Sequence, residues 1–189
     1  MPTADRPLRA DARRNQELLI DAARAVFAED GTEAKMDEIA RRAGVGPGTL
    51  YRHFASRDAL LAAVYRTDIE AMADRAATLA AELPWLDALR AWLLEQLDYI
   101  THKIGMGTAL KSMLSNDVET LSYCRDTMRG ALDQLLGPAQ RAGLMRTDID
   151  PSMLLKLVHG IGVASESNPE QAPFMLDIML AGLRTQQAN

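Results

Sequence analysis

Residues 36–54, MDEIARRAGVGPGTLYRHF, decide the fold of this chain. The stretch contains two short segments with helical spacing, the first ending at Gly44 and the second beginning near Pro47. Gly44 can adopt the left-handed backbone conformation that a sharp turn needs, and Pro47 is harmless in a first helical turn because its missing N–H has no partner there. The pattern therefore predicts a helix-turn-helix between Lys35 and Phe54.

The side chains of this stretch divide into an inner and an outer set. Ala40 is small where the second helix passes close over the first, and Val45 fills the corner between them. The residues expected to face the supporting helices are Ile39, Leu50 and Phe54. The residues left outside are Thr49, Tyr51, Arg52 and His53. Hydroxyl, phenol and imidazole groups can reach phosphate oxygens, and a guanidinium can reach a guanine edge or a phosphate. An ordinary helical hairpin with a solvated outer face is the alternative.

Three runs of residues resemble the tetracycline-repressor (TetR/AcrR) family. They are IARRAGV at residues 39–45, GTLYRHF at 48–54 and SRDALL at 56–61. The preceding helix, with Ala22, Ala23, Phe27 and Gly31, extends the likeness to roughly residues 15–65. Members of this family are mostly homodimeric repressors, in which a C-terminal helical domain binds a small effector and releases DNA. The resemblance implies an all-α, ligand-responsive regulator of transcription.

The resemblance also implies DNA contacts at particular positions. Thr49, Tyr51 and His53 would contact the DNA backbone, and Tyr51 would also lie near a base. Arg52 occupies a variable position that helps to set sequence preference. Arg57 stands where the family often has a lysine that is aimed at a phosphate.

Two positions of the DNA-binding set depart from the family pattern. Gly46 stands where the family usually has serine, and Pro47 where it has a polar or basic residue. Neither offers a side-chain donor, so we expect fewer direct base contacts and more reliance on phosphates and DNA shape. Lys35 stands where a Thr or Ser N-cap is common, which leaves that helix weakly capped unless Asp37 compensates.

The composition bounds the class of protein. A single cysteine among 189 residues excludes an internal disulfide framework, and no apolar run approaches the ~20 residues that span a bilayer. We expect a cytoplasmic protein without a membrane partner. The net charge of −5 is uneven: residues 1–67 carry 11 Lys and Arg against 10 Asp and Glu, whereas residues 68–189 carry 10 against 16. The first third of the chain, which is not acidic overall, can therefore still bind the phosphate groups of DNA.

Helical periodicity runs through the rest of the chain without sustained strand-like alternation, and we predict about nine helices. Ser56 and Asp150 are expected N-caps, and Gly137-Pro138 is expected to kink or end a helix that reaches Arg141. The predicted domains are a flexible basic arm over 1–14, a DNA-binding domain over 15–56, and an effector-binding and dimerisation domain over 57–189. The arm carries Arg6, Arg9, Arg13 and Arg14, which can reach a minor groove or remain a solvated tail.

Apolar stripes with interleaved glycines near residues 151–164 and 171–186 predict a dimer interface with two helices from each subunit. The expected interface residues are Leu154, Leu157, Val158, Ile161, Ile178, Met179 and Leu183. The alternative is that these stripes face the chain's own core. A dimer also suits a palindromic operator, because one small DNA-binding domain contacts too few bases for useful affinity.

An effector pocket is expected among the middle helices. Methionine side chains adapt to flexible apolar ligands, and Trp, Tyr and His add a few polar groups that can form hydrogen bonds. The candidate lining is Trp92, Tyr99, His102, Met106, Met113, Tyr123, Met128 and His159. For each of these residues, plain core packing is the alternative.

Two other classes of protein compete with a regulator. An enzyme is disfavoured because the chain has no Gly-rich phosphate loop, no nucleophile elbow and no His/Cys pair at metal spacing. We therefore expect no catalytic residue, no metal and no cofactor. A helical binding module that has lost DNA binding is the closer rival, and Gly46 and Pro47 are its support.

Overall fold

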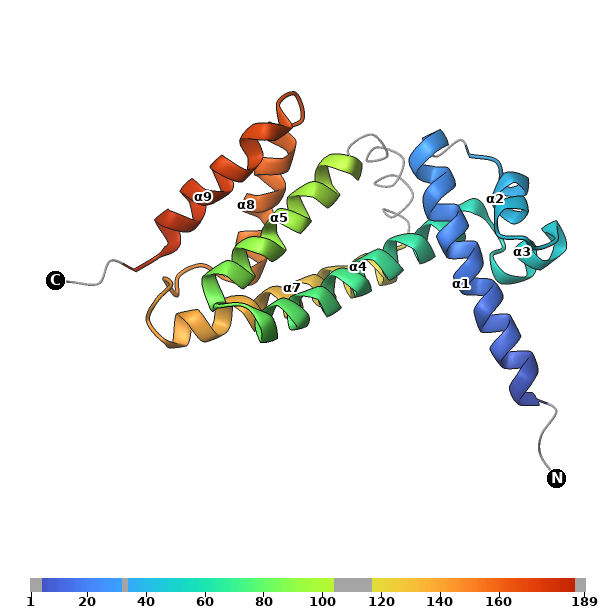
Figure 1. Ribbon diagram of the computed structural model, residues 1–189, viewed down its shortest axis with the longest axis horizontal. Coiled ribbons are helices and arrows are strands. Elements are labelled where there is room, and N and C mark those ends of the chain that lie inside the picture. The colour runs from blue at the N-terminus through green and yellow to red at the C-terminus, as the bar shows by residue number, and fades with distance from the viewer. Residues whose placement is uncertain (1–4, 32–33, 104–116, 186–189) are drawn as a thin grey trace. The chain divides into compact units, whose positions relative to one another are not determined.

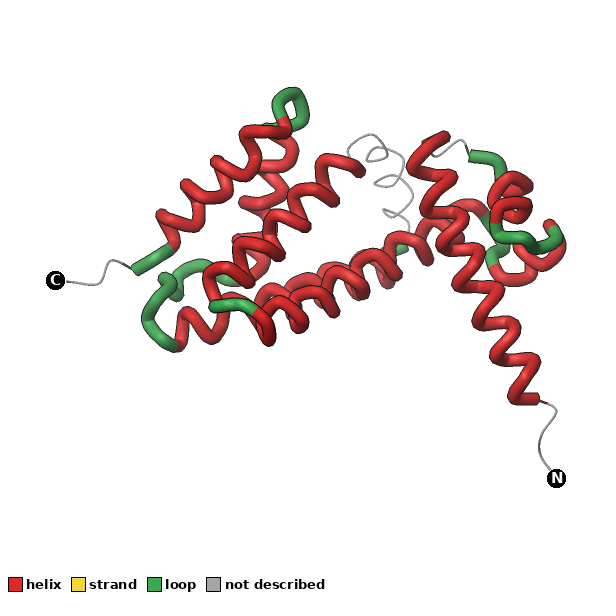
Figure 2. The backbone as a smooth tube through the Cα atoms, in the orientation of Figure 1, coloured by secondary structure: helices red, strands yellow, loops and turns green. Residues whose placement is uncertain are grey.

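The computed structural model describes residues 5–31, 34–103 and 117–185, and their regular structure is helical (Figures 1 and 2). The α-helices in chain order are α1 (Asp5–Asp30), α2 (Met36–Arg42), α3 (Pro47–His53), α4 (Arg57–Glu82), α5 (Trp85–Lys103), α7 (Val118–Arg141), α8 (Pro151–Ala164) and α9 (Ala172–Leu183). A 3-10 turn, η3 (Pro169–Gln171), precedes α9. The all-α class is thus confirmed, with eight of about nine predicted helices. The remaining one, predicted after Gly107, lies outside the described residues.

The chain forms two compact units, divided within α4 between Thr67 and Asp68. The first unit contains α1, α2, α3 and the beginning of α4. The second contains the rest of α4, α5, most of α7, α8 and α9. None of the described helices is long and apolar enough to cross a membrane.

The first unit has a core built from one face of each helix. α1 contributes Leu19, Ala23, Val26 and Phe27, and α4 contributes Leu60, Leu61 and Val64, all of them buried. α1 is followed directly by Gly31, which has a φ of 67° as its place beyond the apolar stripe predicts. The Oγ atom of Ser56 accepts a hydrogen bond from the Ala59 N–H at 3.1 Å, so Ser56 caps α4 as expected.

α1 begins earlier than the sequence predicted. Residues 5–14, expected to form a flexible arm, are helical and continue directly into the packed part of α1. Alanine, arginine and leucine favour a helix, and Pro7 falls in the first turn, where proline is tolerated.

The second unit is organised around α5, which contacts both α8 and α9. Gly162 of α8 lies so close to α5 that a Cβ atom there would be 2.7 Å from Cγ2 of Ile100. Arg90 of α5 holds Asp177 of α9 through two hydrogen bonds, of 2.6 and 2.9 Å. α8 begins at a cap formed by Asp150, whose side chain accepts from the Met153 N–H at 2.8 Å.

α7 does not end at Gly137-Pro138 but continues to Arg141. The proline costs one backbone hydrogen bond, yet Leu135, Leu136 and Ala139 on either side of it are buried. Packing of this turn therefore outweighs the break that the dipeptide favours. α7 is followed by Gly143, which has a φ of 70°.

Candidate nucleic-acid interface

The turn between α2 and α3 has the geometry of a helix-turn-helix corner. Lys35 makes no side-chain hydrogen bond to the start of α2, so that end is weakly capped as predicted. Gly44 has a φ of 69°, and the Val45 N–H donates to the Ala40 carbonyl at 3.0 Å. Ile39 and Ala40 are buried beneath this turn. The corner is thus fixed by one left-handed glycine and by apolar contacts.

The structure separates the inner and outer residues of α3 as the sequence predicted. Leu50 is fully buried, and Phe54 after the helix is also buried. The side chain of Tyr51 is 52% exposed. The other outward residues of the motif divide by exposure: Gly46, Pro47 and Arg52 are exposed, and Thr49 and His53 are half-buried. Arg57, the remaining predicted DNA-binding residue, is half-buried in the first turn of α4.

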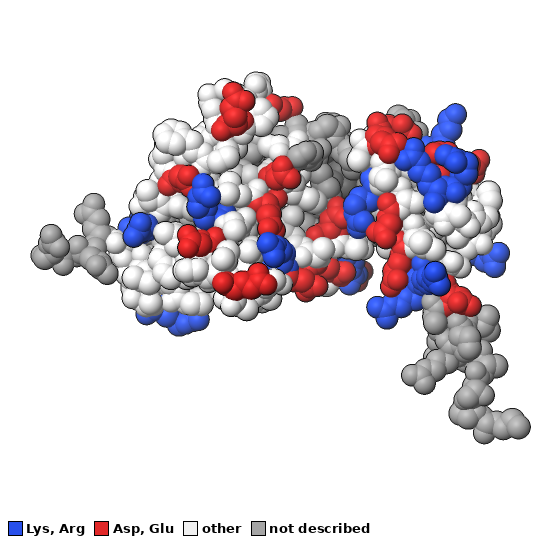
Figure 3. Space-filling model, in the orientation of Figure 1, with Lys and Arg blue, Asp and Glu red and all other residues white. Residues whose placement is uncertain are grey.

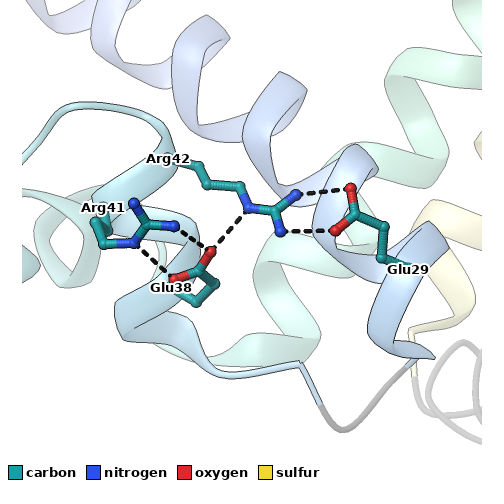
Figure 4. A network of polar contacts seen from close by, with 4 residues as sticks. All are labelled: Glu29, Glu38, Arg41 and Arg42. Atoms are coloured by element: carbon teal, nitrogen blue, oxygen red, sulfur yellow. Dashed lines mark hydrogen bonds and ion pairs between the residues drawn. The ribbon is translucent and has the colours of Figure 1, made fainter.

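Four charged side chains tie α2 to α1 (Figure 4). The guanidinium of Arg42 donates two hydrogen bonds to the Glu29 carboxylate of α1, of 2.7 and 2.6 Å. Arg42 also donates to Glu38 at 2.8 Å, and Arg41 donates twice to Glu38. The separation of Glu38 from the two arginines, three and four residues, is typical of ion pairs within a helix and can be seen in the sequence. Glu29 is 13 residues from Arg42, and only the folded structure brings these two side chains together. Both arginines of α2 are therefore already engaged with carboxylates.

Hydrogen bonds from Arg41 and Arg42 lower the pKa of Glu38 to about 2, and the bond from Arg42 also lowers the pKa of Glu29. A lowered pKa contributes stability above the ordinary value, near 4.5, and this stability is lost as the pH falls toward 2. We therefore expect Glu38→Gln to flatten the dependence of the free energy of unfolding on pH between 4.5 and 2. Urea denaturation at a series of pH values measures it.

Glu82→Gln at the exposed end of α4 is the matched control, and it should keep the acid slope of the original protein. An equal slope for Glu38→Gln and the original protein would contradict the role given to the Glu38 pairs.

Charge is distributed differently over the two units. In the face drawn in Figure 3, basic side chains gather over the helix-turn-helix, mixed with acidic ones, and acidic side chains spread along the second unit. This agrees with the balance of +1 in residues 1–67 and −6 in residues 68–189.

The predicted effector residues lie in different surroundings. Trp92 is fully buried, and its indole N–H donates to the Met72 carbonyl of α4 at 2.9 Å. The hydroxyl groups of Tyr99 and Tyr123 also reach α4, where they donate to Asp68 at 3.5 Å and to Glu70 at 2.7 Å.

Met128 is buried on α7, whereas His159 is exposed on α8 and does not face the interior. The side chain of His102 and the residues Met106 and Met113 lie outside the described residues. The structure thus brings Trp92, Tyr99 and Tyr123 into contact with α4. His159 is not part of this group.

Sequence reasoning missed a further residue on α5. The Oε1 atom of Gln96 is buried and has no hydrogen-bond donor among the described residues. A buried carbonyl oxygen without a partner costs about 1–3 kcal/mol. No clear signal for it is present in the sequence, because Gln96 stands between Glu95 and Leu97 in a stretch of mixed polarity.

One surface hollow of about 500 Å³ lies between α7 and the start of α8, with Asp126, Arg129 and Asp150 in its lining. A second, of about 210 Å³, lies between α5 and the start of α9, with Leu97 and Pro173 in its lining. The residues predicted to bind an effector line neither hollow.

The predicted dimer residues divide between the core and the surface. Leu154, Val158 and Leu183 are buried within their own unit. These three residues therefore face the chain's own core, which was the alternative to an interface. Leu157 and Ile178 are exposed, by 44% and 58%, and Ile161 and Met179 are half-buried. Met153 and Phe174, which were not predicted, are also exposed.

A helix-turn-helix with an exposed second helix, joined to a larger helical unit, defines a class of DNA-binding transcriptional regulators. Residues 19–64 match the model of the bacterial regulatory proteins of the tetR family. Residues 86–185 match the model of the SbtR-like transcriptional regulator C-terminal domain. The chain therefore belongs to the TetR family, as its sequence motifs implied. This is a family of transcriptional regulators and not of enzymes.

Relatives and solved structures agree with this assignment. A TetR transcriptional regulator from Streptomyces coelicolor is 38% identical, with a TM-score of 0.75 over 90% of this chain and 99% of that one. A TetR regulatory protein from Mycobacterium vanbaalenii is 33% identical, with a TM-score of 0.69 over 95% and 100% of the two chains. The HTH-type transcriptional regulator UidR of Escherichia coli K12 is 25% identical over 94% of this chain and 97% of its own length.

Proposed function

We propose that the protein is a cytoplasmic, homodimeric repressor that a small-molecule effector releases from a palindromic operator. The exposed outer face of α3 is the observation that supports operator binding most directly. Tyr51 presents a half-exposed aromatic ring there, while Leu50 beside it is fully buried. A large exposed aromatic side chain on a recognition helix is suited to contact with DNA.

We expect Tyr51→Ala to weaken binding to operator DNA about 10-fold or more, which corresponds to about 1.4 kcal/mol. The ring contributes little to the core of the first unit, so the fold should be retained. Fluorescence anisotropy measures the affinity, with a duplex selected by the original protein from a randomised pool, and circular dichroism checks the helix content.

Leu83→Ala is the matched control, because it removes a partly exposed large side chain from the second unit. It should leave operator affinity unchanged. If Tyr51→Ala also binds with full affinity, α3 is not the recognition helix. If the randomised pool yields no bound duplex at low salt, the non-DNA binding module is the better account.

The outward faces of α8 and α9 support the homodimer. On α8, the outward residues at positions i, i+4, i+7 and i+11 are Met153, Leu157, Gly160 and Ala164. On α9, positions i, i+4 and i+7 hold Phe174, Ile178 and Ala181. This spacing gives one apolar stripe per helix, with large residues at one end and small ones at the other. A Cβ atom at Gly160 of the α8 stripe, or at Gly182 next to the α9 stripe, would meet nothing within 4 Å, so this side of both helices is uncovered in the single chain.

A second copy of the chain is the proposed occupant of these stripes, with two helices from each subunit in a four-helix interface. Each recognition helix reads few bases alone, and two of them can enter successive major grooves about 34 Å apart. The proposed operator is palindromic because the dimer is two-fold symmetric.

The proposed effector site lies among α4, α5 and α7. The unpartnered Oε1 atom of Gln96 supports it, because a ligand N–H or O–H would supply the missing donor. α4 is the proposed transmitter, since its first part holds Leu61 in the core of the first unit and its second part holds Ile69 in the second.

Effector binding would tilt α4 and change the separation of the two recognition helices, which releases DNA. Spin labels on the first unit of each subunit report this separation. Recognition helices that keep their DNA-bound distance in the presence of the effector would contradict the mechanism.

A further inference from the structure

The start of α3 lacks the side chains with which a recognition helix ordinarily reads bases. In a helix-turn-helix, the N-terminal residues of the second helix reach the base edges in the major groove. Here these positions hold Gly46, Pro47 and Gly48, and none of them carries a side-chain donor or acceptor. A Cβ atom at Gly46 or Gly48 would meet nothing within 4 Å, so the DNA edge can approach the backbone closely.

Arg52 is placed to supply the missing donors. Its Nε–H donates to the carbonyl oxygen of Gly48 at 3.1 Å, four residues earlier on α3. The side chain therefore runs back along the helix toward its start instead of extending freely from the last turn. Its guanidinium is fixed to the helix through one nitrogen, and Nη1 and Nη2 remain to bind a ligand.

The charges around the motif leave Arg52 available for DNA. Arg41 and Arg42 of α2 are engaged by Glu38 and Glu29. In the part of the chain that the structure describes, no carboxylate pairs with Arg52, whose side chain is exposed. Two parallel N–H donors of an arginine match the O6 and N7 acceptors of guanine in the major groove.

We propose that Arg52 reads a guanine in each operator half-site through Nη1 and Nη2, and that its Nε–Gly48 hydrogen bond orients it for this contact. This inference rests on the proposed operator binding and adds the base that the operator must contain. Because Gly46, Pro47 and Gly48 offer no competing contacts, one guanine per half-site should dominate the sequence preference.

Selection of bound duplexes from a randomised pool tests the proposal with the original protein, Arg52→Ala and Arg52→Lys. We expect the original protein to select a guanine at one fixed position of each half-site. Replacing that base pair should weaken binding about 10- to 100-fold for the original protein and hardly at all for Arg52→Ala. Arg52→Lys should lose most of the preference, because an ammonium group is not a planar pair of donors.

Arg41→Ala is the matched control, since it removes an exposed arginine of the same motif that is already paired with Glu38. It should select the same guanine as the original protein. Salt titration separates the two possible roles of Arg52. A phosphate contact would reduce the slope of log affinity against log salt by about 1 in Arg52→Ala, with equal weakening on all sequences.

Equal weakening on all sequences, with an unchanged selected consensus, would overturn the guanine assignment and leave operator binding intact. Failure of the original protein to bind any duplex would overturn the proposed function, and this assignment with it. The two failures are therefore distinguishable.

Discussion

Ile178→Asp is expected to convert the proposed dimer into a monomer and to reduce operator binding at least 100-fold. Ile178 is 58% exposed in the single chain, at the centre of the apolar stripe of α9. A carboxylate buried in an apolar interface without a partner costs several kcal/mol, and two-fold symmetry introduces the change on both subunits. Sedimentation equilibrium measures the assembly state, and anisotropy measures operator affinity.

Operator binding should fall with dimerisation, because a single recognition helix retains only one half of the contacts. The variant should remain folded, since the side chain leaves the core of its own unit untouched. Circular dichroism is therefore expected to show unchanged helix content.

Val163→Asp is the matched control for Ile178→Asp. Val163 is 49% exposed on α8. At about 100° per residue it lies about 120° around the helix from Leu157 and about 90° from the middle of the outward stripe. It should leave the dimer intact. A dimer that survives Ile178→Asp, or that Val163→Asp disrupts equally, would show that the proposed stripes are not the interface.

Local signals in the sequence predicted the elements of the fold correctly where a single residue imposes a geometry. Gly31 and Gly44 have positive φ values where turns were expected, and Ser56 and Asp150 cap helices through their side chains. These residues act through their own backbone or through an N–H three residues away. No distant partner is needed, so the sequence alone predicts them.

The errors concern properties that depend on partners distant in the chain. α8 is apolar around most of its circumference, so periodicity did not distinguish Leu154, which faces the core, from Leu157, which is exposed. Pro138 was expected to disrupt α7, but packing of its neighbours holds that turn in the helix. In both cases tertiary contacts decide the outcome.

The exposure of the α3 residues was predicted more completely than the surroundings of the candidate effector residues. Outward residues of α3 follow from the positions of Leu50 and Phe54, because a short helix has one buried side. The interior of the second unit is different, since helical spacing indicates which side chains point inward but not whether space remains between them. His159 shows the limit of predicting burial from helical spacing. The apolar stretch of α8 around it suggested an inward position, but its side chain is exposed.

Trp92 shows how burial changes the interpretation of a candidate effector residue. The fully buried ring and its N–H bond to the Met72 carbonyl join α5 to α4. We expect Trp92→Ala to lower the free energy of unfolding by about 3–5 kcal/mol, the usual cost of removing a buried aromatic side chain. For a chain of this size the melting temperature should fall by about 10 °C. Urea and thermal denaturation measure both quantities.

Trp92→Phe separates the packing contribution from the hydrogen bond. It retains most of the buried ring but loses the N–H donor, so we expect a smaller loss, of about 1–2 kcal/mol. If Trp92 instead formed the wall of an open effector pocket, Trp92→Ala would cost less than about 1 kcal/mol. Because α4 extends into the helix-turn-helix unit, a large loss would identify the α4–α5 contact as the rigid support that the proposed effector mechanism requires.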